Sequence, residues 1–170
     1  FADKPTASIP GACPDWAEPQ AAYRFFDQAS AGKRSPGWQS ILDPHIAQTE
    51  ARMRQHPGVL CLQDSTELDF NGQGIDGLGP LSYEAQRGMY LHPTYVVTPE
   101  REPLGVTDAW MWARESKATD GKRPGIRESL RWTEGYERIA EMAATMPDTR
   151  LVYIADREAD IAALMQRAHV

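Results

Sequence analysis

The chain has 170 residues, of which 41% are hydrophobic and 25% are charged, and its formal net charge is −6. This length and composition are ordinary for one soluble globular domain with a real core. No run approaches the roughly 20 apolar residues of a membrane span, so no membrane association is predicted. Nucleic-acid-binding proteins are usually basic, and the net charge argues against that class, although it does not describe any single face of the molecule.

The termini and the cysteines add two expectations. The chain begins with Phe1 and ends within what reads as a helix, so we expect a fragment or a processed product. Cys13 and Cys61 are expected to be reduced, as in a cytoplasmic protein, and Cys61 lies in an apolar run typical of a core position. The histidines have no Cys or His neighbours at zinc-ligand spacing, so no zinc site is predicted.

The first 57 residues predict an extended arm followed by two helices. Residues 1–14 contain three prolines and a glycine, which favour an extended arm. Asp15 is placed to cap a helix that runs to about Phe26. A second helix is expected over about 38–55, where Pro57-Gly58 ends it.

The remainder of the chain predicts strands and two further helices. Residues 71–80 contain four glycines and a proline and predict a loop. Apolar spacing becomes helical over 128–145 and again over 161–168. Strands are predicted over 59–62, 88–98, 104–112 and 151–155.

This order of elements predicts an α/β fold with a mixed sheet. Three meandering antiparallel strands are followed by a helix and a fourth strand. A right-handed crossover would place the fourth strand beside the first and parallel to it. We therefore divide the chain into an N-terminal helical region, 1–57, and a sheet-forming region, 58–170.

Two aspartates stand directly after strands that are predicted to be neighbours. Asp64 follows the run VLCLQ, and Asp156 follows VYIA. Parallel neighbours would bring both carboxylates to one edge of the sheet, where ligands of α/β folds gather. Close carboxylates take up a proton or a cation, and all-oxygen ligands suit Mg²⁺ or Mn²⁺. The alternative is that each Asp is an ordinary turn or N-cap residue.

Several motifs, in order, resemble one family. They are AAYRFF near the start, DST after the first strand, an ESxRW-like segment at 128–132, and DREADI after the last strand. The intervening strands also fit, with Gly88 and His92 in the second and a tryptophan-rich third. From about residue 20 to 166 the chain resembles the IS-four family of bacterial insertion-sequence transposases.

The resemblance implies an RNase H-like catalytic core with a DDE triad. Asp64 and Asp156 match its two aspartates, which bind Mg²⁺ or Mn²⁺ in the family. The third member, a glutamate, would lie beyond this chain, because Glu158 is too close to Asp156 to stand for it. The fragment alone is therefore expected to be catalytically incomplete. The intact enzyme would nick transposon-end DNA and transfer the strand to target DNA, as a homodimer in the bacterial cytoplasm, associated with the nucleoid.

The resemblance also indicates DNA-contacting side chains, each with an ordinary structural alternative. Arg24 matches a position in the family's helical DNA-binding region, and the alternative is a solvated helix arginine. Arg157 is a candidate phosphate contact that could equally pair with a nearby acid. The weaker candidates are Lys33, Arg34 and Arg131. The residues expected in the core, or satisfied within it, are Tyr23, Phe25, Phe26, His92 and Trp132.

Two other functions remain open at this stage. A truncated transposase derivative would bind DNA or regulate transposition without catalysis. A different metal-dependent nuclease or phosphatase would also use a pair of aspartates.

Overall fold

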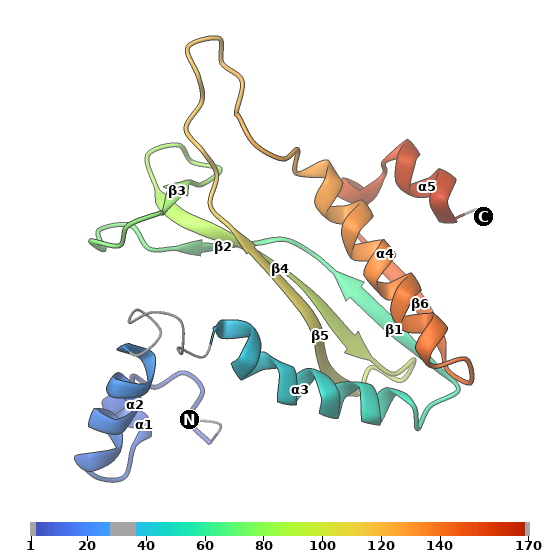
Figure 1. Ribbon diagram of the computed structural model, residues 1–170, viewed down its shortest axis with the longest axis horizontal. Helices are drawn as coiled ribbons and strands as arrows, with labels where there is room; N and C mark the ends of the chain where they lie inside the picture. Colours follow the sequence, from blue (N-terminus) through green and yellow to red (C-terminus); the bar gives the residue numbers. More distant parts are fainter. Residues whose placement is uncertain (1–2, 28–36, 169–170) are drawn as a thin grey trace. The chain divides into compact units, whose positions relative to one another are not determined.

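The computed structural model describes residues 3–27 and 37–168 (Figure 1). The chain divides into two compact units, Phe1–Pro44 and His45–Val170. Each unit is described by itself below.

The first unit contains two short helices, α1 (Ile9–Ala12) and α2 (Ala17–Asp27). The expectation of a wholly extended arm over residues 1–14 is therefore wrong. The Ser8 hydroxyl caps α1 by accepting a hydrogen bond from the N–H of Gly11 at 3.3 Å. Pro10 lies in the first turn, where its missing N–H costs nothing, so proline starts this helix rather than preventing it.

The start of α2 is as predicted. The Asp15 Oδ1 atom accepts hydrogen bonds from the N–H groups of Ala17 at 2.8 Å and Glu18 at 3.2 Å. The aromatic side chains of the helix are not buried, so their assignment to a core is wrong. Their exposed fractions are 47% for Tyr23, 43% for Phe25 and 48% for Phe26. Among the described residues of this unit, the helix in main contact with α2 is α1, which has a single turn and offers little surface to cover them.

Helix α3 (Trp38–Met53) crosses the boundary between the units. Its residues from His45 onward belong to the second unit, where Thr49 and Met53 are fully buried. The sequence-based division at residue 57 therefore differs from the division into compact units. The difference arises because the last two turns of the helix pack into the core of the sheet.

The second unit is built on a six-stranded mixed sheet with the long strand β4 at its centre. Strand β4 pairs antiparallel with four other strands, and β6 pairs parallel with β1. The strands are β1 (Gly58–Gln63), β2 (Thr66–Asp69), β3 (Gly79–Pro80), β4 (Arg87–Val97), β5 (Pro103–Trp112) and β6 (Arg150–Ala155). This arrangement confirms the predicted mixed α/β fold and is consistent with an RNase H-like core.

Two of these strands were not predicted. Strand β2 has only four residues, and most of them are polar and exposed, so it lacks an apolar signal. Strand β3 lies at the end of the predicted loop 71–80. Gly79 is required there because a Cβ atom would collide with the backbone of Arg114. Gly79 therefore allows two backbone segments to pack closely. In the sequence alone such a glycine cannot be told from a glycine in a turn.

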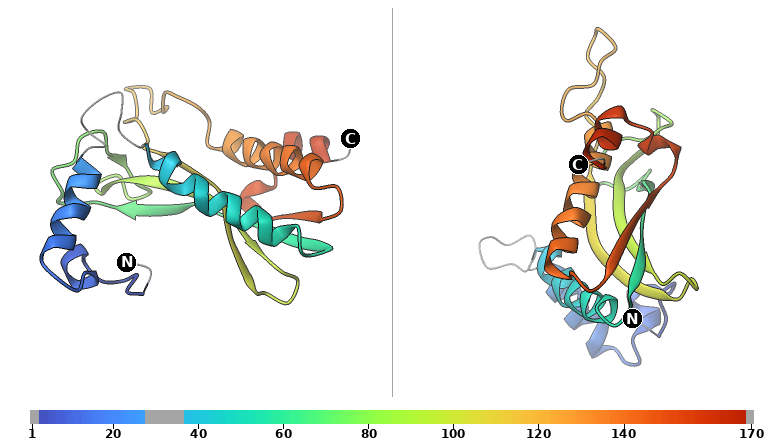
Figure 2. Two further views of the ribbon diagram at one scale, coloured as in Figure 1. Left: turned by 60° about the horizontal axis from the view of Figure 1, so that its bottom comes forward. Right: turned by 90° about the vertical axis from the view of Figure 1, so that its right-hand side faces the viewer.

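The helices of this unit lie on one face of the sheet. They are residues 45–53 of α3, α4 (Ser129–Thr145), the 3₁₀ helix η2 (Arg157–Ala159) and α5 (Ala162–Ala168). Figure 2 shows α4 beside the strands on the same side as the end of α3. The main core between them contains Met53, Val59, Cys61, Val96, Leu104, Ile139 and Met146.

One smaller expectation is settled by burial. Cys61 is fully buried, as predicted, and desolvation raises the pKa of its thiol to about 12. In the described part of the chain no helix has the length and apolarity needed to cross a membrane.

Candidate catalytic edge and DNA-contacting residues

Asp64 and Asp156 directly follow two strands that pair in parallel. The parallel pairing of β1 and β6 ends with Gln63 opposite Ala155. Each aspartate is the next residue of its strand, so both leave the sheet at the same edge. We call this pair the acidic edge. Its position follows from the parallel crossover that the order of elements predicted.

Each aspartate uses one oxygen to hold the local backbone. The Asp64 Oδ1 atom accepts from the N–H of Ser65 at 2.7 Å. The Asp156 Oδ1 atom accepts from the N–H of Glu158 at 2.8 Å and caps η2. Both residues are exposed, and within residues 3–27 and 37–168 neither Oδ2 atom takes part in a hydrogen bond. The turn and N-cap roles are therefore real, and they leave one oxygen of each carboxylate for a ligand.

A buried polar network supports the Asp64 side of the edge. The Gln63 Nε2 atom donates to the Thr94 hydroxyl at 2.8 Å. The Gln63 Oε1 atom lies 3.3 Å from His92 Nε2, and His92 Nδ1 lies 2.8 Å from the Ser65 hydroxyl. An amide oxygen can only accept, so His92 carries its proton on Nε2 and accepts from Ser65 on Nδ1. The histidine thereby fixes the residue that follows Asp64.

His92 is a neutral, satisfied strand histidine, as the sequence led us to expect. Burial is the largest influence on its pKa and lowers it, and Arg131 and Arg138 lower it further. Asp108 and Asp64 act in the opposite direction without reversing the shift. A neutral ring is needed for the hydrogen bond that it accepts from Ser65.

Helix α4 holds this network from the covered face of the sheet. The Trp132 ring meets the His92 ring edge-to-face, with centroids 4.6 Å apart. Gly135 is the point of closest approach, where a Cβ atom would collide with the Gln63 side-chain amide. Trp132 is buried, as predicted, with Ala159 and Leu164. The start of α4 therefore sets the position of the support beneath Asp64.

The carboxylate oxygens at the acidic edge are of the chemical type that binds a hard divalent cation. Carboxylate oxygens are the ligands that Mg²⁺ and Mn²⁺ prefer. Among the described residues there is no cluster of three or more His, Cys, Asp or Glu side chains that could hold a metal ion. The edge itself contains two carboxylates.

The candidate DNA-contacting residues fall in different settings. Arg24 is exposed in the last turn of α2, and Arg157 is exposed in η2 directly after Asp156. Lys33 and Arg34 lie outside the described residues. Arg131 is only 9% exposed, and its guanidinium carbon lies 4.6 Å from the centre of the Trp110 ring and 5.1 Å from that of Trp112.

Of the two acids after Asp156, one lies in the first turn of the helix that follows and the other at its end. Glu158 lies in the first turn of η2, and Asp160 is the C-cap residue of the same short helix. An acid in a first turn complements the partial positive charge of the backbone there.

Sequence reasoning did not find the network under Asp64 or the role of Arg114. The residues of the network are isolated polar positions in two strands, β1 and β4, and in the turn after β1, and no short motif joins them. Arg114 did carry a signal, because it continues the alternation of Trp110 and Trp112 by one more step of two. In the structure Arg114 stacks on the Tyr90 ring at 4.0 Å.

Comparison with known proteins bears on the first unit. No curated protein matches this chain. Residues 1–31 match the family model described as transposase DNA-binding. The matched stretch contains α1, α2 and Arg24. This match supports a transposase-related role with DNA as a partner.

Proposed function

We propose that this protein is a DNA transposase of the DDE type, similar to the IS-four family, which nicks transposon-end DNA and transfers the strand to target DNA. The observation that supports the proposal is that Asp64 and Asp156 directly follow the neighbouring parallel strands β1 and β6. The match of residues 1–31 to transposase DNA-binding proteins supplies the substrate class.

Asp64 and Asp156 would hold Mg²⁺ or Mn²⁺ through their free oxygens, and the metal would activate the attacking oxygen and neutralise charge on the phosphate. Ser65 and His92 hold the backbone that follows Asp64. Phosphoryl transfer depends mainly on positioning and charge neutralisation, so this rigid support is what the reaction needs from the fold. We assign no third carboxylate within this chain.

Local binding of Mn²⁺ is the direct test. Mn²⁺ broadens NMR signals of nearby nuclei, and titration should broaden the amide signals of Ser65 and Arg157 first. Asp64→Asn and Asp156→Asn should each abolish this selective broadening, because each removes one of two charged ligands.

Asp69→Asn is the matched control. Asp69 is also exposed, and it also accepts a backbone hydrogen bond, from the N–H of Asn71 at 2.7 Å. This variant should bind Mn²⁺ like the wild type. Equal broadening at Asp69 and at the acidic edge would refute the metal assignment. In a nicking assay on transposon-end DNA with a chain that carries the complete triad, activity that survives either edge substitution would refute catalysis there.

A second candidate is a transposase-derived protein that binds DNA without cutting it. It is favoured by the local roles of both aspartates, which already hold a turn and an N-cap through Oδ1. In that case DNA binding persists, Mn²⁺ broadening at the edge is absent, and both Asp→Asn variants behave like the wild type.

A further inference from the structure

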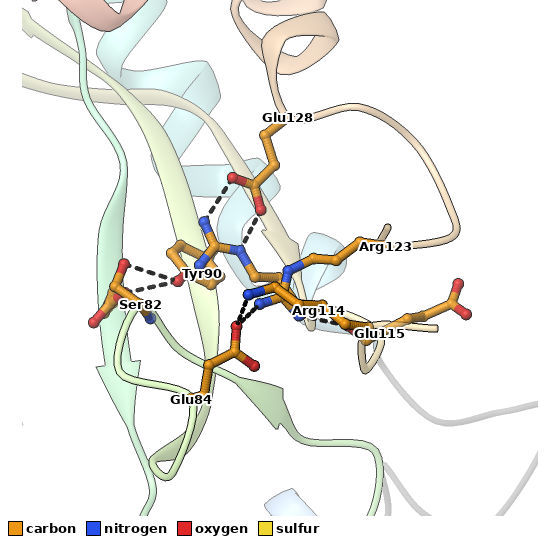
Figure 3. Close-up of polar contacts among 9 residues, drawn as sticks. Ser82, Glu84, Tyr90, Arg114, Glu115, Arg123 and Glu128 are labelled. Atoms are coloured by element: carbon orange, nitrogen blue, oxygen red, sulfur yellow. Dashed lines mark hydrogen bonds and ion pairs between the residues drawn. The ribbon is translucent and has the colours of Figure 1, made fainter. Parts of the chain in front are cut away.

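A second polar site in the same unit is lined by neither residue of the acidic edge. It is a pocket of about 770 Å³, bordered by the end of β5, the segment 113–128 and the start of α4. The loop that carries Ser82 and Glu84 forms its opposite border. Figure 3 shows Arg114 and Arg123 in this region, each turned toward a glutamate. We call it the arginine pocket.

The arginine pocket is cationic in a chain whose net charge is −6. Five basic side chains line it against three acidic ones, so it holds an excess of two positive charges. The basic residues are Arg114, Lys117, Arg123, Arg127 and Arg131, and the acidic residues are Glu84, Glu115 and Glu128. Any attraction for an anion in this unit must come from such local concentrations of charge.

Part of this charge is neutralised within the pocket. Arg114 forms a two-pronged ion pair with Glu128, and one of its contacts, from Nη2 to Oε2, is 2.6 Å long. Glu84 is shared by Arg123 and by Lys117, whose Nζ lies 2.9 Å from Oε1. These pairs order the walls of the pocket, and the acid paired with Arg131 is Glu134 instead, at the longer distance of 3.7 Å.

Arg131 is buried in the wall with unused donors. Its Nε and Nη1 atoms are buried and have no hydrogen-bond partner among the residues that the structure describes. The nearest acid, Glu134, places Oε2 3.7 Å from Nη1, which is too far for a hydrogen bond. A charged group whose buried hydrogen-bond donors have no partner is costly in free energy. In native proteins such donors are usually satisfied by a ligand or by ordered water. The guanidinium is therefore a prepared donor group.

Aromatic rings keep this donor group in place. Arg131 lies over Trp110 and Trp112, and Trp112 stacks on Tyr90 with ring centroids 5.4 Å apart. Arg114 covers the Tyr90 ring. Stacked guanidinium groups lose little freedom when they bind an oxyanion, because their planar donors are already oriented.

The N-terminus of α4 adds a partial positive charge to the arginine pocket. No side chain caps this helix, because the N-cap residue Glu128 directs its carboxylate to Arg114. The N–H groups of Leu130 and Arg131 donate to the carbonyls of Arg127 and Glu128, so what remains is the helix dipole, whose positive end favours anions.

We propose that the arginine pocket binds a phosphate group of the DNA backbone, at a site separate from the acidic edge. This inference rests on the proposed function for the identity of the anion. Guanidinium donors suit phosphate oxygens, and the volume admits a nucleotide-sized segment rather than a single ion. Arg131 at the base and Arg127 at the exposed rim are the contacting residues, and Arg114 orders the wall.

The test is an NMR titration of the ¹⁵N-labelled chain with a random-sequence DNA duplex. The side-chain Nε–H signal of Arg131 and the indole signal of Trp112 should shift on binding. Arg127→Gln should weaken binding several-fold and reduce the slope of log affinity against log salt by about 0.9, the value for one phosphate contact.

Arg54→Gln is the matched control, since Arg54 is an exposed arginine outside the pocket, paired with Glu50. It should leave the affinity and the salt slope unchanged. Duplex binding without shifts at Arg131 and Trp112 would overturn the pocket assignment and leave DNA binding itself intact. Shifts caused by inorganic phosphate or by poly-glutamate, but not by duplex, would overturn DNA as the ligand.

The two proposals fail separately. Asp64→Asn removes a proposed metal ligand but no pocket residue, so it should leave the Arg131 and Trp112 shifts as they are. Loss of those shifts in Asp64→Asn would contradict a site separate from the acidic edge.

Discussion

The acidic edge and the arginine pocket are two concentrations of charge on one sheet, and they are built in opposite ways. At the acidic edge the side chains are exposed and each aspartate bonds to backbone N–H groups. In the arginine pocket charged side chains bond to one another and stack on aromatic rings, and Arg131 is buried. Charge at the edge can therefore be removed with little loss of stability, whereas charge in the pocket is part of the packing.

The largest effect is expected where the supports of both regions meet, at Trp132. This ring packs against His92 on one side and against Ala159 and Leu164 on another. Trp132→Ala should lower the free energy of unfolding by about 3–5 kcal/mol, the usual loss for a large core aromatic. Urea denaturation measures it. Leu130→Ala, an exposed position in the same helix, should change stability by less than about 0.5 kcal/mol.

Arg131 tests whether the pocket is held together by charge or by packing. Arg131→Ala removes two cation–π contacts and a packed side-chain stem, and should cost about 1–3 kcal/mol. Arg131→Met keeps contact with the tryptophans and removes the unsatisfied donors, so it should cost less than half as much. Equal losses for the two variants would show that the positive charge itself stabilises the fold.

The two regions also differ in how far the sequence predicted them. The acidic edge was found because its signal is local: an apolar strand followed by Asp, twice, in an order that predicts parallel neighbours. The pocket depends on Arg114, Glu128 and Glu84, which are far apart in the chain and meet only through the path of the segment 113–128. Arg131 was named from its motif, but its burial against two tryptophans depends on the rotation of α4 against β5.

The fold likewise divides into elements with a local sequence signal and elements that depend on distant parts of the chain. Long elements with clear periodicity, such as α4 and β4, were predicted nearly to their ends. The short strand β2 was missed because its pairing with β4, rather than its own composition, makes it a strand. Burial of α2 was overestimated, since an amphipathic pattern gives the apolar side of a helix but not the area available to cover it.

Asp156 should separate the structural role of the acidic edge from its proposed chemistry. Asp156→Ala removes the cap of η2 and should lower the free energy of unfolding by about 0.5–1 kcal/mol. Asp156→Asn keeps a good capping side chain and should leave the free energy of unfolding almost unchanged. Asp64 caps no helix, so Asp64→Ala should lower the free energy of unfolding by less than about 0.5 kcal/mol. Thermal or urea denaturation of the three variants checks this order. A large loss in Asp156→Asn would mean that the negative charge is needed for folding.

The smallest expected effect is a pH dependence carried by His92, and it connects the two regions. Burial lowers the pKa of this ring below 6.5, so below about pH 6.5 the unfolded chain binds more protons than the folded one. The contribution of His92 to stability is therefore complete above that pH and is lost as the pH falls toward the folded-state value. The charge of Asp64 raises the pKa of His92, whereas the charge of Arg131 lowers it. Asp64→Asn should therefore shift the NMR titration midpoint of the His92 ring downward, and Arg131→Met should shift it upward. Shifts in the same direction would show that His92 responds to repacking of α4 rather than to the charges of the two regions.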